Sequence, residues 1–207
     1  MRLVGCGGAG ALGQEGREME FTGHNGGPEL DAPLAWRTHA WRRAREALVP
    51  VLPVEVVRLR VRRAQELGLD YRTYAGVRAS TGRDVIGFLF SSNALRALRA
   101  GETLPEDRRL RLGAIIGADR TALVQPPLSP VVAARDWPVE AAVAAPGALL
   151  GWPAMRDRVR DILRMRGLPP DGVLVIGETA LEREWAEAGR TAGFLSGDRY
   201  FGSAAGG

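Results

Sequence analysis

The stretch DGVLVIGETALEREWAEAGRTAG, residues 171–193, joins a short apolar run to a polar turn and an amphipathic segment. Residues 173–176 are apolar and mostly branched, which is typical of a strand buried on both faces of a parallel sheet. After Gly177, apolar side chains recur every three or four residues, and this spacing predicts a helix. Thr179 and Glu182 have the T-x-x-E spacing of a capping box. The stretch therefore predicts one half of a βαβ unit.

Two glycines affect the stability and the end of this predicted helix. Gly189 lies in its interior, where glycine costs about 1 kcal/mol relative to alanine. Gly193 follows the last apolar position, and we expect it to end the helix.

A second apolar run, Val85–Phe90, predicts another buried strand. Ser91, Ser92 and Asn93 follow it, and the spacing of later leucines predicts a helix after them. Open α/β sheets bind ligands at the carboxyl ends of their strands, and helix N-termini attract anions. Five residues are therefore candidates for binding an anionic, phosphate-type ligand: Ser91, Ser92, Asn93, Glu178 and Thr179. The alternative is that Ser91 or Ser92 only caps the following helix.

The remaining patterns complete an α/β fold: a small parallel sheet flanked by helices, with an Arg-rich helical N-terminal segment. Helices are expected over residues 33–48, 54–67, 105–116 and 155–166, with a strand as the alternative for 109–116. Residues 121–124 predict a further strand. Residues 125–153 are rich in Pro, Ala and Gly, which indicates a long connection with one short helix near 139–143.

Composition and length suggest one globular domain. The chain has 207 residues, an apolar share of 45% and a formal charge of +4. We expect residues 1–30 to be a disordered Gly-rich leader, with Met19 as a plausible true start, residues 31–201 to be a single domain and 202–207 to be a disordered tail. The single cysteine, Cys6, fits a reducing and hence cytoplasmic location. No apolar stretch reaches the about 20 residues of a membrane span.

The leader contains the pattern Gly5-x-Gly7-x-x-Gly10, which is found in dinucleotide-binding proteins. It lacks the preceding strand and following helix that this function requires. His24 lies among turn residues without cysteine or acidic partners at metal-ligand spacing, so a solvated loop histidine is expected. The sequence therefore indicates no cofactor and no metal site.

Arginine is concentrated in the N-terminal half. Between Trp36 and Arg99 there are 13 Arg and five acidic residues. Ala64, Gly68, Tyr74 and Val77 have the spacing of a helix-turn-helix, although Arg63 occupies a position that normally requires an apolar residue. Nucleic-acid binding through residues 54–83 is therefore an alternative function. Its candidate contacts are Arg62, Arg63, Arg72 and Arg78. The competing interpretation is a helical hairpin with solvated Arg faces.

The order of the two polar turns resembles the later motifs of the haloacid dehalogenase superfamily. That resemblance implies phosphate binding by the serines after Phe90 and Mg²⁺ binding by Glu178 and Glu182, four residues apart. The chain departs from the family at the nucleophile, because no Asp-x-Asp precedes Val85 and covalent phosphoryl transfer needs that carboxylate. A Mg²⁺-dependent phosphate-ester hydrolase is therefore a second alternative, and capping with an ion pair is the other interpretation of the two glutamates.

The preferred hypothesis from sequence is a binding or regulatory protein with a small anionic ligand at the two strand-to-helix turns. Enzymatic activity and oligomeric state stay open.

Overall fold

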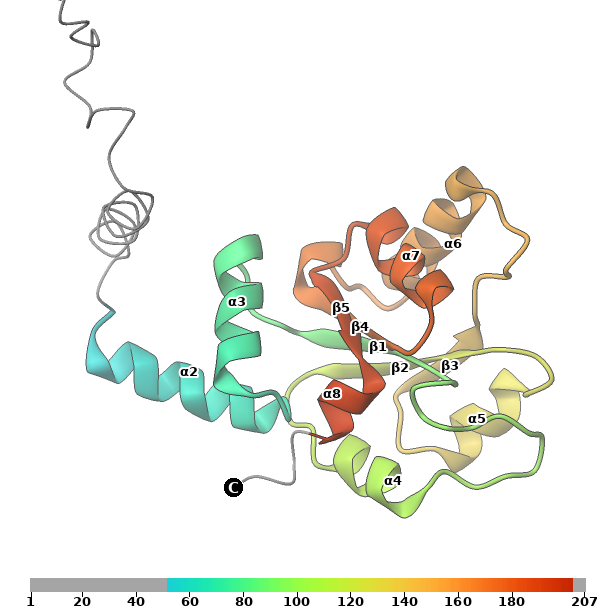
Figure 1. Cartoon of the computed structure of the whole chain (residues 1–207), viewed down its shortest axis with the longest axis horizontal. Helices are drawn as coiled ribbons and strands as arrows, with labels where there is room; N and C mark the ends of the chain where they lie inside the picture. Colours follow the sequence, from blue (N-terminus) through green and yellow to red (C-terminus); the bar gives the residue numbers. More distant parts are fainter. Residues whose placement is uncertain (1–51, 203–207) are drawn as a thin grey trace, which may run out of the picture. The chain divides into compact units, whose positions relative to one another are not determined.

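The computed structural model of this protein describes residues 52–202, which contain a five-stranded, entirely parallel sheet in the order β3-β2-β1-β4-β5 (Figure 1). The strands are β1 (Gly87–Ser91), β2 (Asp119–Val124), β3 (Ala141–Ala144), β4 (Val173–Gly177) and β5 (Gly193–Ser196). The chain starts at the central strand, extends the sheet to one edge, returns to the centre and extends it to the other edge. This is a doubly wound sheet, and its topological switch point lies between β1 and β4. The predicted α/β class is confirmed.

Within residues 52–202, seven helices flank the sheet. They are α2 (Val54–Glu66), α3 (Tyr71–Thr81), α4 (Glu106–Gly113), α5 (Pro130–Asp136), α6 (Trp152–Met165), α7 (Ala180–Gly189) and α8 (Gly197–Gly202). A 3-10 turn, Pro170–Gly172, precedes β4. Side chains of α6 and α7 form the core on one face of the sheet, and those of α2, α3, α4, α5 and α8 form the core on the other (Figure 1).

The central strands are continuously apolar because both of their faces are buried. Phe88 and Phe90 of β1 pack into the core that contains α8, whereas Leu89 packs against α6 and α7. Tyr200 of α8 lies 5.6 Å from the rings of both phenylalanines, measured between ring centroids. All five residues of β1 and of β4 are buried, so the two sequence runs that predicted strands form the centre of the sheet.

The prediction for residues 125–153 was wrong in detail. A helix occupies 130–136, and the segment expected to be helical near 139–143 contains β3. β3 is mostly alanine, whose side chain does not favour a strand. Pairing with β2, from Thr121 opposite Ala141 to Val124 opposite Ala144, supplies the backbone partners that local sequence did not reveal.

The helix expected after Asn93 is also wrong. Residues 92–96 form turns, in which Arg96 N–H donates to the carbonyl of Asn93 at 2.8 Å and Ala97 N–H donates to that of Ser92 at 2.9 Å. Leu95 and Ala97 are buried by these turns. Apolar spacing alone does not distinguish such a folded connection from a helix.

The end of α7 differs from expectation as well. The helix ends at Gly189, and Gly193 begins β5. The missing side chain of Gly189 has a packing reason, because a Cβ there would lie 2.5 Å from Val159 Cγ1 of α6. Glycine is therefore required by the close approach of the two helices.

The predicted leader, the helix over 33–48 and residues 203–207 of the tail lie outside the described residues. Within residues 52–202, no helix combines the length and apolar character needed to cross a membrane.

Candidate functional site

The two predicted turns lie side by side at the carboxyl edge of the sheet. β1 pairs directly with β4, with Phe90 opposite Ile176, so the residues that follow these strands are neighbours. Their accessibility differs, however. Ser91 and Ser92 are buried, Asn93 is half-buried, and Glu178 and Thr179 are exposed. Sequence therefore placed the two turns correctly but did not indicate that both serines are covered.

Both serines bind the protein's own backbone. The Ser91 hydroxyl accepts from Ala94 N–H at 3.0 Å, and the Ser92 hydroxyl accepts from Gln125 N–H at 3.2 Å. Ser91 thus caps the turn that leaves β1, and Ser92 holds the connection after β2. These contacts make the serines part of the scaffold of this edge.

Glu182 is the centre of the polar network at the switch point. Its side chain is 0% exposed, and both carboxylate oxygens have two donors. One oxygen accepts from the amides of Asn93 at 2.9 Å and Gln125 at 3.0 Å. The other accepts from the backbone N–H of Glu178 at 2.5 Å and of Thr179 at 2.9 Å. Because a carboxylate oxygen offers two lone pairs, Glu182 is saturated.

The predicted capping box is confirmed by this arrangement. The Thr179 hydroxyl accepts from Glu182 N–H at 3.3 Å, while Glu182 returns to Thr179 N–H. Gly177 makes room for the return, because a Cβ there would lie 2.8 Å from Glu182 Cβ. Glu182 therefore occupies the place at the start of α7 where an external anion could otherwise bind.

Arg108 of α4 was not predicted as a site residue, although it is the most unusual charged group near this edge. Only 4% of the residue is exposed, and its guanidinium lies 4.0 Å from the ring centroid of Phe201. Nη1 forms an ion pair with Asp107 at 3.4 Å. Nε has no hydrogen-bond acceptor among the described residues. Burial lowers the pKa of Arg108, and Asp107 acts in the opposite direction.

Three other charged side chains act on Arg108 electrostatically: Arg96, Glu178 and Asp198. We refer to these four residues as the Arg108 cluster. Arg96 donates to Asp198 at 3.2 Å. The Glu178 carboxyl packs against Gly197 and accepts from the backbone of Asp198. Although Glu178 is exposed as a residue, partial burial of its carboxyl, followed by repulsion from Asp198, raises its pKa above the ordinary value of 4.5. The cluster thus combines two cations with two acids, one of which holds its proton more tightly than usual.

No local signal in the sequence distinguishes Arg108. It lies in the segment DRRLR with two further arginines, Arg109 and Arg111. Arg109 is exposed and pairs with Glu106, whereas Arg111 donates to the carbonyl of Gly68. The three arginines differ in their surroundings because α8 packs against α4, and this packing is not visible in the local sequence.

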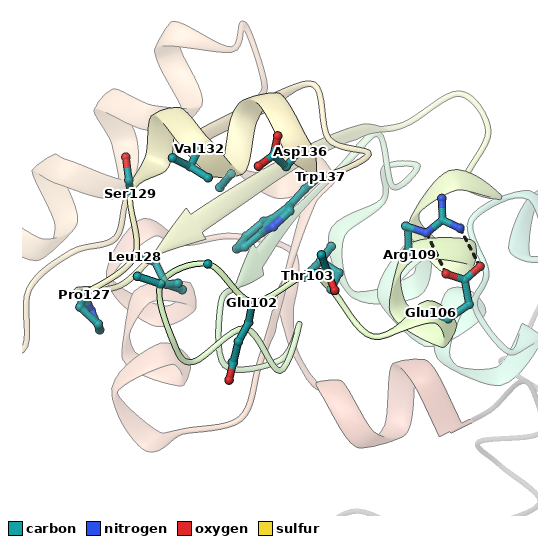
Figure 2. A pocket seen from close by; sticks show the side chains of 14 residues that line it. Glu102, Thr103, Glu106, Arg109, Pro127, Leu128, Ser129, Val132, Asp136 and Trp137 are labelled. Atoms are coloured by element: carbon teal, nitrogen blue, oxygen red, sulfur yellow. Dashed lines mark hydrogen bonds and ion pairs between the residues drawn. The ribbon is translucent and has the colours of Figure 1, made fainter.

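A pocket of about 420 Å³ lies beside the same edge, between α5 and the connections that follow β1 and β2 (Figure 2). Figure 2 shows Trp137 between α5 and the segment that carries Glu102 and Thr103. The apolar part of the pocket's lining includes Leu104, Leu128, Val132 and Trp137. The charged lining comprises Glu102, Glu106, Asp136 and Arg109. Because three carboxylates and one guanidinium line this pocket, it is less suited to binding an anion than the surroundings of Arg108 are.

Residues 54–81 contain two consecutive helices, α2 and α3, with Ala64 and Tyr74 buried and Gly68 at φ +67° between them. Of the four cations proposed to contact nucleic acid, two have other partners. Arg63 binds Asp84 at 3.0 Å and the carbonyls of residues 85, 116 and 117. This explains why an arginine occupies a position that was expected to be apolar.

Arg78 lies 3.7 Å from Asp84, again an internal partner. Nucleic-acid binding stays a hypothesis, and of its four candidate contacts Arg62 and Arg72 are the exposed ones.

The geometry does not assemble the magnesium pair implied by the resemblance to haloacid dehalogenases. Glu182 has no lone pair left for a metal, because four donors already bind its oxygens. Across residues 52–202, no three His, Cys, Asp or Glu side chains are grouped as metal ligands. The hydrolase hypothesis therefore gains no support from the site.

Comparison with known protein families, curated proteins and solved structures finds no match for this chain. The site contains a buried guanidinium, that of Arg108, whose Nε has no acceptor within residues 52–202.

Proposed function

We propose that this chain is a binding protein for a small anion of the phosphate or carboxylate type, held by Arg108 at the carboxyl edge of the sheet. The observation that carries the proposal is that Arg108 is almost fully buried while its Nε lacks an acceptor in the part of the chain that the structure describes. Buried charges normally have ionic and hydrogen-bond partners, and an exception calls for an explanation. A bound anion supplies that partner.

The chemistry of Arg108 suits this ligand. A guanidinium presents planar donors that match the oxygens of a carboxylate or phosphate. Stacking on Phe201 fixes the plane, and Asp107 offsets little of the buried charge because its own side chain is 66% exposed. Glu178 and Asp198 add negative charge to the cluster, which favours an anion of low charge.

Thermal unfolding in the presence of inorganic phosphate or sulfate tests the proposal, with chloride at matched ionic strength as the reference. We expect phosphate or sulfate to raise the midpoint by about 5 °C or more at a concentration about 100-fold above the dissociation constant. Arg108→Met keeps an apolar contact with Phe201 but removes the charge, so the rise should disappear.

Arg109→Met is the matched control. It removes an exposed guanidinium from the adjacent position of α4, and the response to the anion should be retained. An equal rise in Arg108→Met and wild type, or no rise in wild type, contradicts the proposal.

A further inference from the structure

A second hollow lies between α3 and the edge strand β5. This α3–β5 groove has a volume of about 640 Å³. Leu174 and Leu195 contribute sheet side chains to its lining, while α3 contributes the small residues Gly76 and Ser80. Gly76 is exposed, and a Cβ there would meet nothing within 4 Å, so a larger side chain has room at this position of the lining.

The strand that borders the groove has a free side. β5 is the last strand in the sheet order and pairs only with β4 among the described strands. Gly193, Phe194 and Ser196 are half-buried, not covered. An edge strand directs backbone N–H and C=O groups away from its sheet, and these can pair with an additional extended chain.

The charged residues that line the groove are both cations, Arg72 and Arg199. Arg72 is exposed, and Arg199 donates to Thr73 at 2.8 Å. Asp70, at the start of α3, is not part of the lining; it accepts hydrogen bonds from Thr73 and acts electrostatically on Arg199. Arg72 is therefore the more available of the two cations.

We propose that the α3–β5 groove binds an extended acidic peptide segment of a partner protein. The peptide adds a strand beside β5, and its backbone pairs with the free edge. Its carboxylates lie near Arg72 and Arg199. Extended pairing is favoured over a nucleic-acid ligand because the groove combines its arginines with an unpaired strand edge and apolar side chains, and it lacks a surface of stacked aromatic rings.

Fluorescence polarisation with the full chain tests this proposal. The probe is a short labelled peptide of alternating Glu and Val, compared with one of alternating Lys and Val. We expect saturable binding of the acidic peptide only. A version N-methylated at alternate residues loses the donors of one edge and should bind about tenfold more weakly or not at all.

Gly76→Leu fills the groove from a position with open space, and we expect it to weaken the acidic peptide about tenfold or more. The matched control is Gly113→Leu in α4, where an added Cβ also meets nothing within 4 Å, and binding should be unchanged. Arg72→Gln combined with Arg199→Gln should weaken binding and reduce its salt dependence. The proposal is overturned if Gly76→Leu binds as wild type, if methylation has no effect, or if a single-stranded oligonucleotide binds in a Gly76-dependent manner while the peptide does not.

Discussion

The starts of α7 and α4 contain two buried charged side chains that are treated in opposite ways. Glu182 in α7 is fully buried and has four hydrogen-bond donors. Arg108 in α4 is almost as buried, yet its Nε has no acceptor within residues 52–202. The hydrogen bonds of Glu182 account for its burial, because they hold the surrounding turns together. The burial of Arg108 has no such explanation among the described residues, and for that reason we propose a ligand for Arg108 and not for Glu182.

The same contrast continues along the two helices. α7 approaches α6 so closely that Gly189 has no room for a side chain, whereas Gly113 of α4 faces open space. α4 also borders the pocket in Figure 2 through Glu106 and Arg109. The α7 side is therefore closely packed at Gly189, whereas α4 has open space at Gly113 and borders a pocket.

The largest expected effect on stability comes from removing the Glu182 carboxylate. Glu182→Ala leaves four donors without their acceptor, and we expect the free energy of unfolding to fall by about 3 kcal/mol or more. Urea unfolding followed by circular dichroism measures it. Glu187→Ala, an exposed change on the same helix, should stay within about 0.5 kcal/mol of wild type. Equal effects of the two substitutions would remove the structural role that we give Glu182.

A smaller effect tests the packing difference. Gly189→Ala gains helix propensity but places a methyl group 2.5 Å from Val159 Cγ1. The overpacking outweighs the gain, so we expect a net loss of about 1 kcal/mol. Gly113→Ala meets nothing and should instead gain about 0.5 kcal/mol. If both substitutions shift the urea midpoint in the same direction, the two helices do not differ in the way described.

The smallest effect concerns Glu178, which lies between the two regions. Burial and Asp198 raise its pKa in the folded state, so the folded protein binds this proton more tightly than the unfolded chain. The stability gained from protonation is present below the ordinary value of 4.5 and is lost as the pH rises through the folded pKa. Glu178→Gln should therefore slightly increase stability at neutral pH.

Urea unfolding across a pH series measures this change, and the advantage of Glu178→Gln over wild type should shrink as the pH falls below 4.5. Glu187→Gln provides the baseline for an exposed glutamate of α7. An advantage of the same size at every pH would mean that proton binding by Glu178 is not its cause.

Much of the central fold could be predicted because its signals are local. The strands at 85–90 and 173–176 are apolar runs, and the start of α7 is marked by a threonine and a glutamate three residues apart. The site was predictable only to the level of two neighbouring turns. Sequence offered Ser91 and Ser92 either as ligand-binding residues or as a cap, and in the structure both are buried and their hydroxyls bind backbone groups.

The sequence by itself determined the α/β class, the two central strands and the capped start of α7, because each depends on residues close together in the chain. Tertiary structure alone decided β3 and β5, whose weak local signals are overcome by pairing with β2 and β4. It also decided the partners of Glu182, which come from positions 89 and 57 residues away. Tertiary structure also decided the burial of Arg108 under Phe201. Hydrogen-bond saturation depends on which distant groups meet, and local residue patterns do not encode that.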